Sequence, residues 1–291
     1  MIEQLAIITV TYNSSAVIEK FIISLFKQSY SNWYLYIIDS ASTDDTLKKV
    51  YTDSDERITL LPQPINVGFA EGNNIGIRQA ISDGFKCVLL INNDTEFDAD
   101  FLDKLLLDHR NYPNFVITPK IHYAGTDKIW CAGGGFKPVQ AFAAYHRGEG
   151  EYDIGQYDQD CKCDFVPMCC VLIPVNVWQK VGELDNKFFI YSEDADWFYR
   201  AKKLGIKLVY CFQPSLQHKV SSLTGGAQSQ IGASYGTRNR IYFIRKHFYG
   251  LQKIFLLLVY FCGMSVKFLS GKYSLKEFGW RLRAFFKGLS L

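Results

Sequence analysis

The sequence predicts an α/β fold in which a mostly parallel sheet is flanked by helices and followed by a helical C-terminal extension. Short apolar runs alternate with amphipathic stretches through the first third of the chain, which is the pattern of strands joined by crossover helices. A basic, apolar stretch then fills the C-terminus. The 291 residues suffice for one large domain or two modest ones, and 48% hydrophobic residues with 21% charged residues are globular values.

Four strands and three helices are expected in order in the first part of the chain. The strands are 5–10, 33–38, 58–61 and 87–91. The first helix follows Ser14 or Ser15, the second follows the capping segment 42–45, and the third spans 68–82. No GxGxxG loop follows the first strand, which argues against a dinucleotide-binding fold.

The second half of the sequence is less regular. We expect turns at 133–135, a mobile loop at 152–160, and a buried strand at 165–174. A helix at 193–204, capped by Ser192 and closed by Gly205, precedes a strand at 206–212 and a loop at 218–226. Helices are expected from there to the end.

Charge is unevenly distributed along the chain. The net charge is +3, yet residues 238–291 hold eleven Lys or Arg and one acid, for +10, so the rest of the chain carries −7. The apolar run 254–266 lies within this basic segment and is shorter than the ~20 residues that span a bilayer. Such a segment is typical of a helix on an anionic membrane surface, although a helix buried on the core is the alternative. Long aliphatic runs between the basic residues disfavour nucleic acid as a partner.

Cysteine spacing and the N-terminus indicate a cytosolic protein. The eight cysteines form no disulfide pattern and no CxxC pair, which favours reduced thiols. The N-terminus runs directly into a strand, with no basic region or cleavage site, so no secretory signal is expected.

Polar residues follow three of the predicted strands. They are Thr11, Tyr12 and Asn13, then Asp39, and then Asn92, Asn93 and Asp94. In open α/β sheets ligands bind at the carboxyl ends of the strands. Asp94 offers a hard oxygen ligand for Mg²⁺ or Mn²⁺ against a diphosphate, and Asp39 could accept the N3–H of a uracil or thymine base. Ordinary turn chemistry is the alternative interpretation of these residues.

Five segments together resemble the GT-A-fold family 2 glycosyltransferases. Four of them are 10–13, 38–44, 66–70 and 91–95, and the fifth, 191–197 with Arg200, resembles the acidic acceptor-side motif of that family. The resemblance covers roughly residues 5 to 245. The most similar subgroup contains bacterial rhamnosyltransferases and related enzymes of O-antigen, capsule and cell-wall polysaccharide assembly.

The resemblance implies roles for individual residues. The nucleotide-sugar site would comprise Thr11, Tyr12, Asn13, Asp39, Ser42, Asn66, Gly68, Asn73, Asn92 and Asn93. The acceptor or phosphate side would comprise Gly134, Glu193, Trp197 and Arg238. Asp94 and His218 would bind Mg²⁺ or Mn²⁺, with Asn92 replacing the first carboxylate of the family's Asp-x-Asp motif. Asp194 matches the catalytic base, and Arg200 could be only a salt-bridge partner of Asp196, four residues earlier.

The function expected from the resemblance is inverting, metal-dependent sugar transfer. A dTDP- or UDP-sugar, rhamnose among the candidates, would be the donor, and a lipid-linked saccharide at the inner face of the bacterial membrane would be the acceptor. Residues 1–105 would bind the nucleotide sugar, 106–235 the acceptor and 236–291 the membrane, with a homodimer left open. The alternatives are a nucleotidyltransferase, which would need a glycine-rich basic loop near the N-terminus, and a non-catalytic partner subunit.

Overall fold

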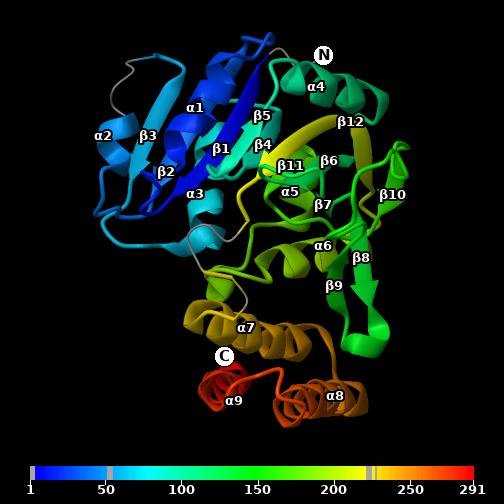
Figure 1. The fold of residues 1–291 in the computed structure, drawn as a ribbon. Helices are drawn as coiled ribbons and strands as arrows, with labels where there is room; N and C mark the ends of the chain where they lie inside the picture. The colour runs from blue at the N-terminus through cyan, green and yellow to red at the C-terminus, as the bar shows by residue number, and fades with distance from the viewer. Residues whose placement is uncertain (1–3, 51–54, 221–224, 227) are drawn as a thin grey trace.

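A computed structural model describes residues 4–50, 55–220, 225–226 and 228–291 of the protein. It shows a large mixed sheet with helices on both faces, a small hairpin beside it, and three long helices at one end (Figure 1). The α/β fold expected from the sequence is confirmed.

The main sheet has ten strands, and its central order is β10-β12-β6-β11-β4-β1-β2-β3. The predicted strands of the first third are β1 (Leu5–Thr11), β2 (Trp33–Asp39), β3 (Ile58–Pro62) and β4 (Cys87–Ile91). These four strands pair in parallel. The remaining strands are β5 (Thr95–Phe97), β6 (Val116–Tyr123), β7 (Ile129–Cys131), β10 (Cys161–Cys163), β11 (Cys170–Pro174) and β12 (Leu208–His218). β11 lies antiparallel between β4 and β6, whereas β6 and β12 are parallel.

Helices cover both faces because successive strand residues point to opposite sides. On one face Leu5 and Ile7 pack in a cluster with α1 (Ile18–Phe26) and α4 (Phe101–Asn111). On the other face Ala6 and Ile8 join a cluster that includes side chains of four further helices. These helices are α3 (Gly68–Ser82), α5 (Val175–Val181), α6 (Glu193–Lys203) and α7 (Gln230–His247). The short α2 (Thr46–Val50) follows the segment expected to cap it, where Asp44 accepts a hydrogen bond from the Thr46 N–H.

The structure corrects several expected boundaries. Residues 165–169 do not join the strand, which begins at Cys170, because Pro167 has no N–H to donate and a turn follows it. The strand expected to end at 212 continues to His218 through an irregularity after Tyr210. Instead of turns, residues 134–137 form β8 (Gly134–Lys137), which pairs with β9 (Ala143–His146). Part of the loop expected at 218–226 lies outside the described residues.

The C-terminal helices form a separate layer below the sheet domain in Figure 1. The layer consists of α7, α8 (Gly250–Leu269) and α9 (Leu275–Ser290), with the last two on the far side of α7. The proposed division points at 105/106 and 235/236 fall inside α4 and α7, so neither is a linker. Within the described residues, only α8 is long and apolar enough to cross a membrane, by length and composition alone.

Candidate active site

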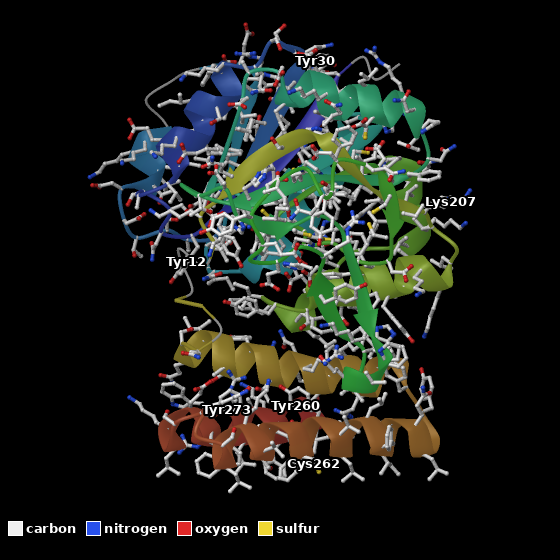
Figure 2. The ribbon with its side chains drawn as sticks, turned by 45° about the vertical axis from the view of Figure 1, so that its right-hand side comes forward. Tyr12, Tyr30, Lys207, Tyr260, Cys262 and Tyr273 are labelled. Carbon is white, nitrogen blue, oxygen red and sulfur yellow. The ribbon has the colours of Figure 1, made fainter. Side chains whose placement is uncertain are left out.

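Asp39 ties together the carboxyl ends of β1 and β2. Its Oδ1 accepts hydrogen bonds from the Thr11 and Ser42 hydroxyls at 2.8 and 2.6 Å, and its Oδ2 accepts the Ser42 N–H at 2.9 Å. The Asn13 N–H donates to Ser42 Oγ, and Asn13 has a positive φ of 51°. The exposed Tyr12 lies at the same edge (Figure 2). Four predicted nucleotide residues and Tyr12 therefore converge, with Asp39 largely buried beneath them.

The asparagines predicted to bind nucleotide mainly form hydrogen bonds with the protein backbone. Asn93 is buried and donates to the Val10 carbonyl at 2.7 Å, which fixes the end of β4 against β1. Asn66 accepts the Gly68 N–H at the start of α3, and buried Asn73 donates to a carbonyl within α3. Asn92 is half-buried, and its backbone N–H donates to the Cys169 carbonyl. Asn73 and Asn93 thus stabilise the walls of the site instead of presenting free amides to it.

Asp94 and His218 form a close pair at the same edge. His218 Nε2 lies 3.1 Å from Asp94 Oδ1, and both side chains are more than nine-tenths buried. The pair exists because β5 runs antiparallel to β12 with Thr95 opposite His218. The His218 ring packs edge-on against Trp130, and its Nδ1 makes no hydrogen bond within the described part of the chain. A carboxylate oxygen and an imidazole nitrogen at this separation fit a divalent cation.

Three carboxylates begin α6, and their surroundings separate their pKa values. Burial, followed by the charge of Asp194, raises the pKa of Glu193 well above its usual value. Burial also raises the pKa of Asp194, to about 6, although the Ala195 and Met168 N–H groups oppose the shift. Asp196 is fully buried, yet hydrogen bonding to His247 and the charges of neighbouring cations outweigh its burial and lower its pKa to about 2.

The neighbours of Asp196 lie on two helices. Its Oδ1 is 2.7 Å from His247 Nε2 and 2.8 Å from Lys246 Nζ, both on α7. Its Oδ2 accepts from Arg200 Nε at 2.9 Å, so the predicted salt bridge is confirmed. The Arg200 guanidinium also donates to the Val181 carbonyl. Asp196 therefore binds α6 to α7 and is charged at neutral pH, which leaves Asp194 as the carboxylate able to exchange a proton near pH 6.

The loop that leads into α6 has a strained backbone. Phe189, Tyr191 and Ser192 have φ values of 64°, 68° and 70°, which non-glycine residues rarely adopt. Ser192 occupies the N-cap position as predicted, but its side chain makes no capping hydrogen bond. The Phe189 carbonyl accepts the Phe69 N–H, and a side chain at Gly68 would clash with Phe189. Gly68 thus allows the start of α3 to support this loop.

Asn239 of α7 supports the other side of the loop. Its Nδ2 lies 2.8 Å from the Phe188 carbonyl oxygen and 2.7 Å from those of Ile190 and Tyr191. Asn239 is completely buried. One amide therefore holds a strained segment three residues upstream of Asp194. The sequence analysis missed Asn239, since a lone asparagine between two arginines carries no motif that would distinguish it.

Comparisons with known proteins place the chain in a family. The family model described as Glycosyl transferase family 2 matches residues 6–174, more than half of the chain. The protein is a member of glycosyl transferase family 2. The recognition made from the motifs is confirmed, and the chain is a glycosyltransferase.

The relatives include a glycan biosynthesis hexosyltransferase and two rhamnosyltransferases. The chain is 24% identical over 216 residues to low-salt glycan biosynthesis hexosyltransferase Agl10 of Haloferax volcanii. The aligned region covers 72% of this chain and 66% of Agl10. It is 24% identical to dTDP-rhamnosyl transferase RfbF of Shigella flexneri, over 82% of this chain and 79% of RfbF. It is 22% identical to the N-acetylglucosaminyl-diphospho-decaprenol L-rhamnosyltransferase of Mycobacterium tuberculosis, over 85% and 86% of the two chains.

A solved structure supports the fold. The glycosyltransferase superposes on mannosyltransferase PcManGT from Pyrobaculum calidifontis, in complex with GDP-Man and Mn²⁺, with a TM-score of 0.59 and 13% identity. The alignment covers 98% of this chain and 87% of that chain. The GT-A fold inferred from the motifs is therefore confirmed.

Three residues assigned to the acceptor or phosphate side of the glycosyltransferase have structural roles. Trp197 is fully buried, donates its indole N–H to the Gly182 carbonyl and stacks on Trp178, because its position on α6 faces the core. At Gly134 a Cβ would lie 2.1 Å from the Tyr145 carbonyl oxygen, so β9 requires glycine there. Arg238 donates to the carbonyls of residues 187 and 188 and so helps to hold the strained loop.

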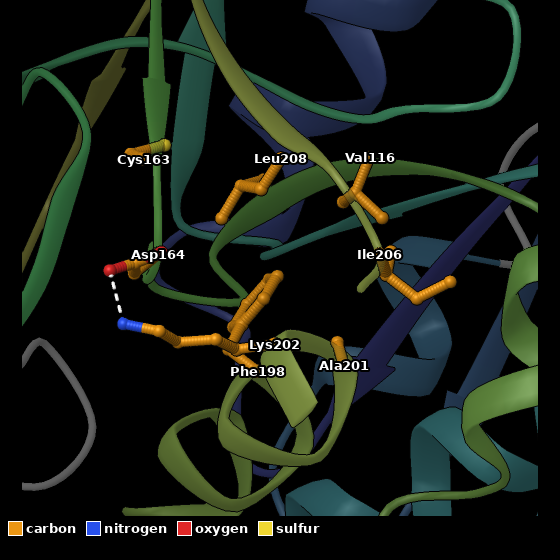
Figure 3. Close-up of a pocket in the computed structure, with 8 residues that line it drawn as sticks. All are labelled: Val116, Cys163, Asp164, Phe198, Ala201, Lys202, Ile206 and Leu208. Carbon is orange, nitrogen blue, oxygen red and sulfur yellow. Dashed lines mark hydrogen bonds and ion pairs between the residues drawn. The ribbon is translucent and has the colours of Figure 1, made fainter. Parts of the chain in front are cut away.

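Two further features of the glycosyltransferase lie away from this site. A small pocket beside α6 is lined by Val116, Phe198 and Leu208, with Lys202 and Asp164 paired at 2.6 Å beside it (Figure 3).

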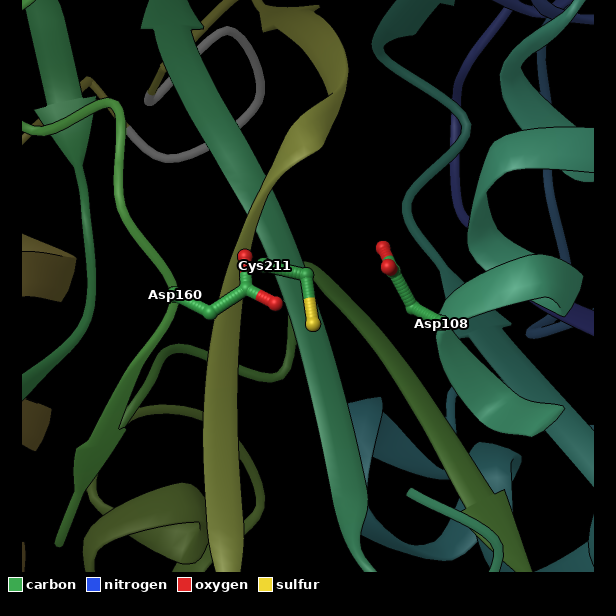
Figure 4. Close-up of side chains that lie close together, drawn as sticks. All are labelled: Asp108, Asp160 and Cys211. Carbon is green, nitrogen blue, oxygen red and sulfur yellow. The ribbon is translucent and has the colours of Figure 1, made fainter. Parts of the chain in front are cut away.

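The second feature is a cluster of Asp108, Asp160 and Cys211, whose ligand atoms all lie within 4.8 Å of one another (Figure 4). Burial and the charge of Asp160 raise the pKa of Asp108 to about 6. The Tyr112 hydroxyl donates to Asp160 Oδ2. Two carboxyl groups this close in a partly buried site raise the proton affinity of one of them, here Asp108.

Proposed function

We propose that this glycosyltransferase moves a sugar from a dTDP- or UDP-sugar to a saccharide on a lipid carrier, with inversion at the anomeric carbon. The relatives whose names specify a donor or an acceptor support this proposal, since one is a dTDP-rhamnosyl transferase and another acts on a decaprenol-linked sugar. Rhamnose is therefore the first sugar to test. The acceptor would lie at the cytoplasmic face of the cell membrane, with the enzyme bound there peripherally, in bacterial surface polysaccharide synthesis.

The observation that carries the proposal is the difference in pKa among the three carboxyl groups at the start of α6. Asp194, with a pKa of about 6, is mostly ionised at neutral pH and can accept a proton. In the proposed step an acceptor hydroxyl oxygen bonds to the anomeric carbon while the bond from that carbon to the diphosphate breaks. The hydroxyl proton passes to the Asp194 carboxylate. One displacement inverts the configuration and needs no covalent enzyme intermediate.

Asp94 and His218 are the residues that would hold Mg²⁺ or Mn²⁺. The 3.1 Å between His218 Nε2 and Asp94 Oδ1 and the burial of both side chains support this assignment. When bound, such a cation neutralises charge on the leaving diphosphate. The structure of a GT-A relative with Mn²⁺ adds support. With only one carboxylate in the motif, we expect weaker metal affinity than a site with two would give.

The edge formed by Thr11, Asn13, Asp39 and Ser42 is the proposed nucleotide site. Asp39 Oδ2 accepts one hydrogen bond within the described residues, so it retains capacity for the N3–H of a uracil or thymine base. The exposed Tyr12 is available to pack on the base. A dTDP- or UDP-sugar is therefore the first donor to test.

The proposal is tested with purified protein, a dTDP- or UDP-sugar panel and a polyprenyl-diphosphate-linked sugar. Asp194→Asn should bind donor normally while transfer falls by about 10²–10⁴-fold, as expected for loss of a general base. Glu183→Gln is a matched control, because Glu183 is an exposed carboxylate paired with Arg78 away from the start of α6. Near-normal transfer by Asp194→Asn would remove Asp194 from the mechanism. No turnover of any donor by the native enzyme, with or without Mn²⁺, would favour the non-catalytic partner subunit.

A further inference from the structure

The outer face of α8 carries a continuous apolar stripe. Its members recur every three or four residues and therefore lie on one side of the helix, and they are Leu251, Ile254, Phe255, Leu258, Cys262, Val266 and Leu269. The six aliphatic and aromatic members are 52–85% exposed, and Cys262 is exposed as well. In Figure 2 the side chains below α8, Cys262 among them, point away from the rest of the protein. Nothing among the described residues covers this stripe.

The opposite face of α8 is anchored to the domain. Leu256 and Met264 are buried, and the Tyr260 hydroxyl lies 3.4 Å from Thr237 Oγ1 on α7. Arg281 of α9 reaches the same Thr237 oxygen at 3.4 Å. The inner sides of α8 and α9 thus meet the same position of α7.

α9 closely follows the surface of α7 and returns the chain to the domain. A Cβ at Gly288 would lie 2.5 Å from the Arg238 carbonyl oxygen, so the two backbones approach closely. Phe268 of α8 stacks on Phe278 of α9 with ring centres 4.3 Å apart. Both ends of α8 are consequently held at the same face of the protein, an arrangement incompatible with a helix whose ends lie on opposite sides of a bilayer.

The charge pattern agrees with this arrangement. Lys253 and Lys267 bracket the apolar core of α8, and the 13 uncharged residues between them extend about 20 Å. On α9 the exposed Lys276, Arg283 and Lys287 share one flank of the helix. Basic side chains on the two helices complement the anionic headgroups of a bilayer surface, and the exposed apolar stripe complements its acyl chains.

We infer that α8 and α9 form a platform that docks on an anionic bilayer, with α8 lying in the plane of the interface and its stripe immersed below the headgroups. This inference deepens the proposed function, on which the lipid-linked nature of the acceptor rests. The occupant of the stripe is the bilayer itself, and neither a spanning position of α8 nor a second copy of the chain is required.

Docking is tested by flotation of the full-length protein on phosphatidylethanolamine vesicles with or without phosphatidylglycerol. Phosphatidylglycerol should increase the bound fraction, and high salt should reduce it without abolishing it, because the apolar face remains. The double variant Phe255→Asp/Leu258→Asp should lower the bound fraction about tenfold or more, since both carboxylates would enter the apolar layer. Ile154→Asp is the matched control, as Ile154 is 84% exposed in the loop between β9 and β10.

The orientation of α8 is tested by depth-dependent fluorescence quenching. A polarity-sensitive dye is placed at Cys262, or at Leu251→Cys or Leu269→Cys in a Cys262→Ser background, and lipids carry a quencher near the headgroup or deep in the acyl chain. The three positions extend about 27 Å along the helix. An in-plane helix gives the same shallow depth at all three. A dye at position 262 that lies much deeper than both others would show a spanning helix and overturn the inference.

Failure of docking can be distinguished from failure of the proposed function. If the native protein does not float on anionic vesicles but transfers sugar to a short-chain soluble acceptor, only the docking inference is wrong. In that case a dimer in sedimentation that Phe255→Asp/Leu258→Asp dissociates would show that a second copy covers the stripe. If the protein floats as expected but transfers no sugar, the docking inference stands and the proposed function fails.

Discussion

Replacement of Asn239 by leucine removes the amide that supports the loop before α6. The Asn239 amide has two N–H groups, and its Nδ2 lies 2.7–2.8 Å from the carbonyl oxygens of residues 188, 190 and 191. At about 1 kcal/mol for each hydrogen bond, with a further penalty for buried carbonyls left without a donor, we expect the free energy of unfolding to fall by about 3 kcal/mol. Leucine has a similar volume, so a cavity contributes little to this loss.

The same substitution should impair catalysis in molecules that remain folded. The positive φ values of Phe189, Tyr191 and Ser192 are unfavourable by roughly 1–3 kcal/mol each, so a loop without its support can relax and move Asp194. Misplacement of a catalytic group by about 1 Å can lower the rate by ~10²-fold. We therefore expect kcat to fall by that order while the affinity for UDP or dTDP changes little.

Urea unfolding followed by tryptophan fluorescence gives the stability, and initial rates at low temperature give kcat. Asn74→Leu is the control, because buried Asn74 also makes two backbone bonds, both to Leu184, away from the start of α6. The control should lose comparable stability with kcat largely preserved. The reasoning is refuted if Asn239→Leu is as stable as the native protein, or if its folded fraction turns over at the native rate.

Three further predictions follow from the titrating and metal-binding groups. Because Asp194 must be deprotonated, kcat/KM should fall tenfold per pH unit below about pH 6, and a pH profile that is flat to pH 5 would contradict this assignment. Asp94→Ala and His218→Ala should each weaken Mn²⁺ binding in the presence of UDP, measured by calorimetry, and EDTA should inhibit the native enzyme. Asp196 has its pKa lowered to about 2, so it stabilises the fold above pH 4, and this contribution is lost as the pH falls towards 2. Asp196→Asn should lower the free energy of unfolding by about 3 kcal/mol in urea titrations, since it removes the buried charge that faces Arg200 and Lys246.

Much of the parallel half of the sheet could be predicted from local sequence. The bounds of α3 and β4 agree with the prediction, and β1, β2 and β3 differ from it by one residue each. Runs of apolar residues separated by capped helices specify these elements through short-range contacts, and parallel pairing follows from the crossover pattern. The motifs at the strand ends were sufficient to identify the family and to nominate Asp94, Asp194 and His218.

Only the tertiary structure decided which nominated residues act together. The distance between Asp94 and His218 depends on the pairing of β5 with β12, two strands more than a hundred residues apart in sequence. Trp197 belongs to a recognisable motif, yet its position on α6 directs it into the core. The different pKa values of Glu193, Asp194 and Asp196 depend on burial and on His247 and Lys246 of α7, which local sequence does not contain, as well as on the nearby Arg200.

The C-terminal segment shows the same division between local pattern and long-range packing. Its composition determined that it would be helical, basic and amphipathic, since these properties depend on residue spacing alone. Which side of α8 stays exposed depends on the contacts of Tyr260 and Arg281 with Thr237 and on the close approach of Gly288 to α7. Contacts between helices that are distant in sequence set that orientation, so only the folded chain could reveal it.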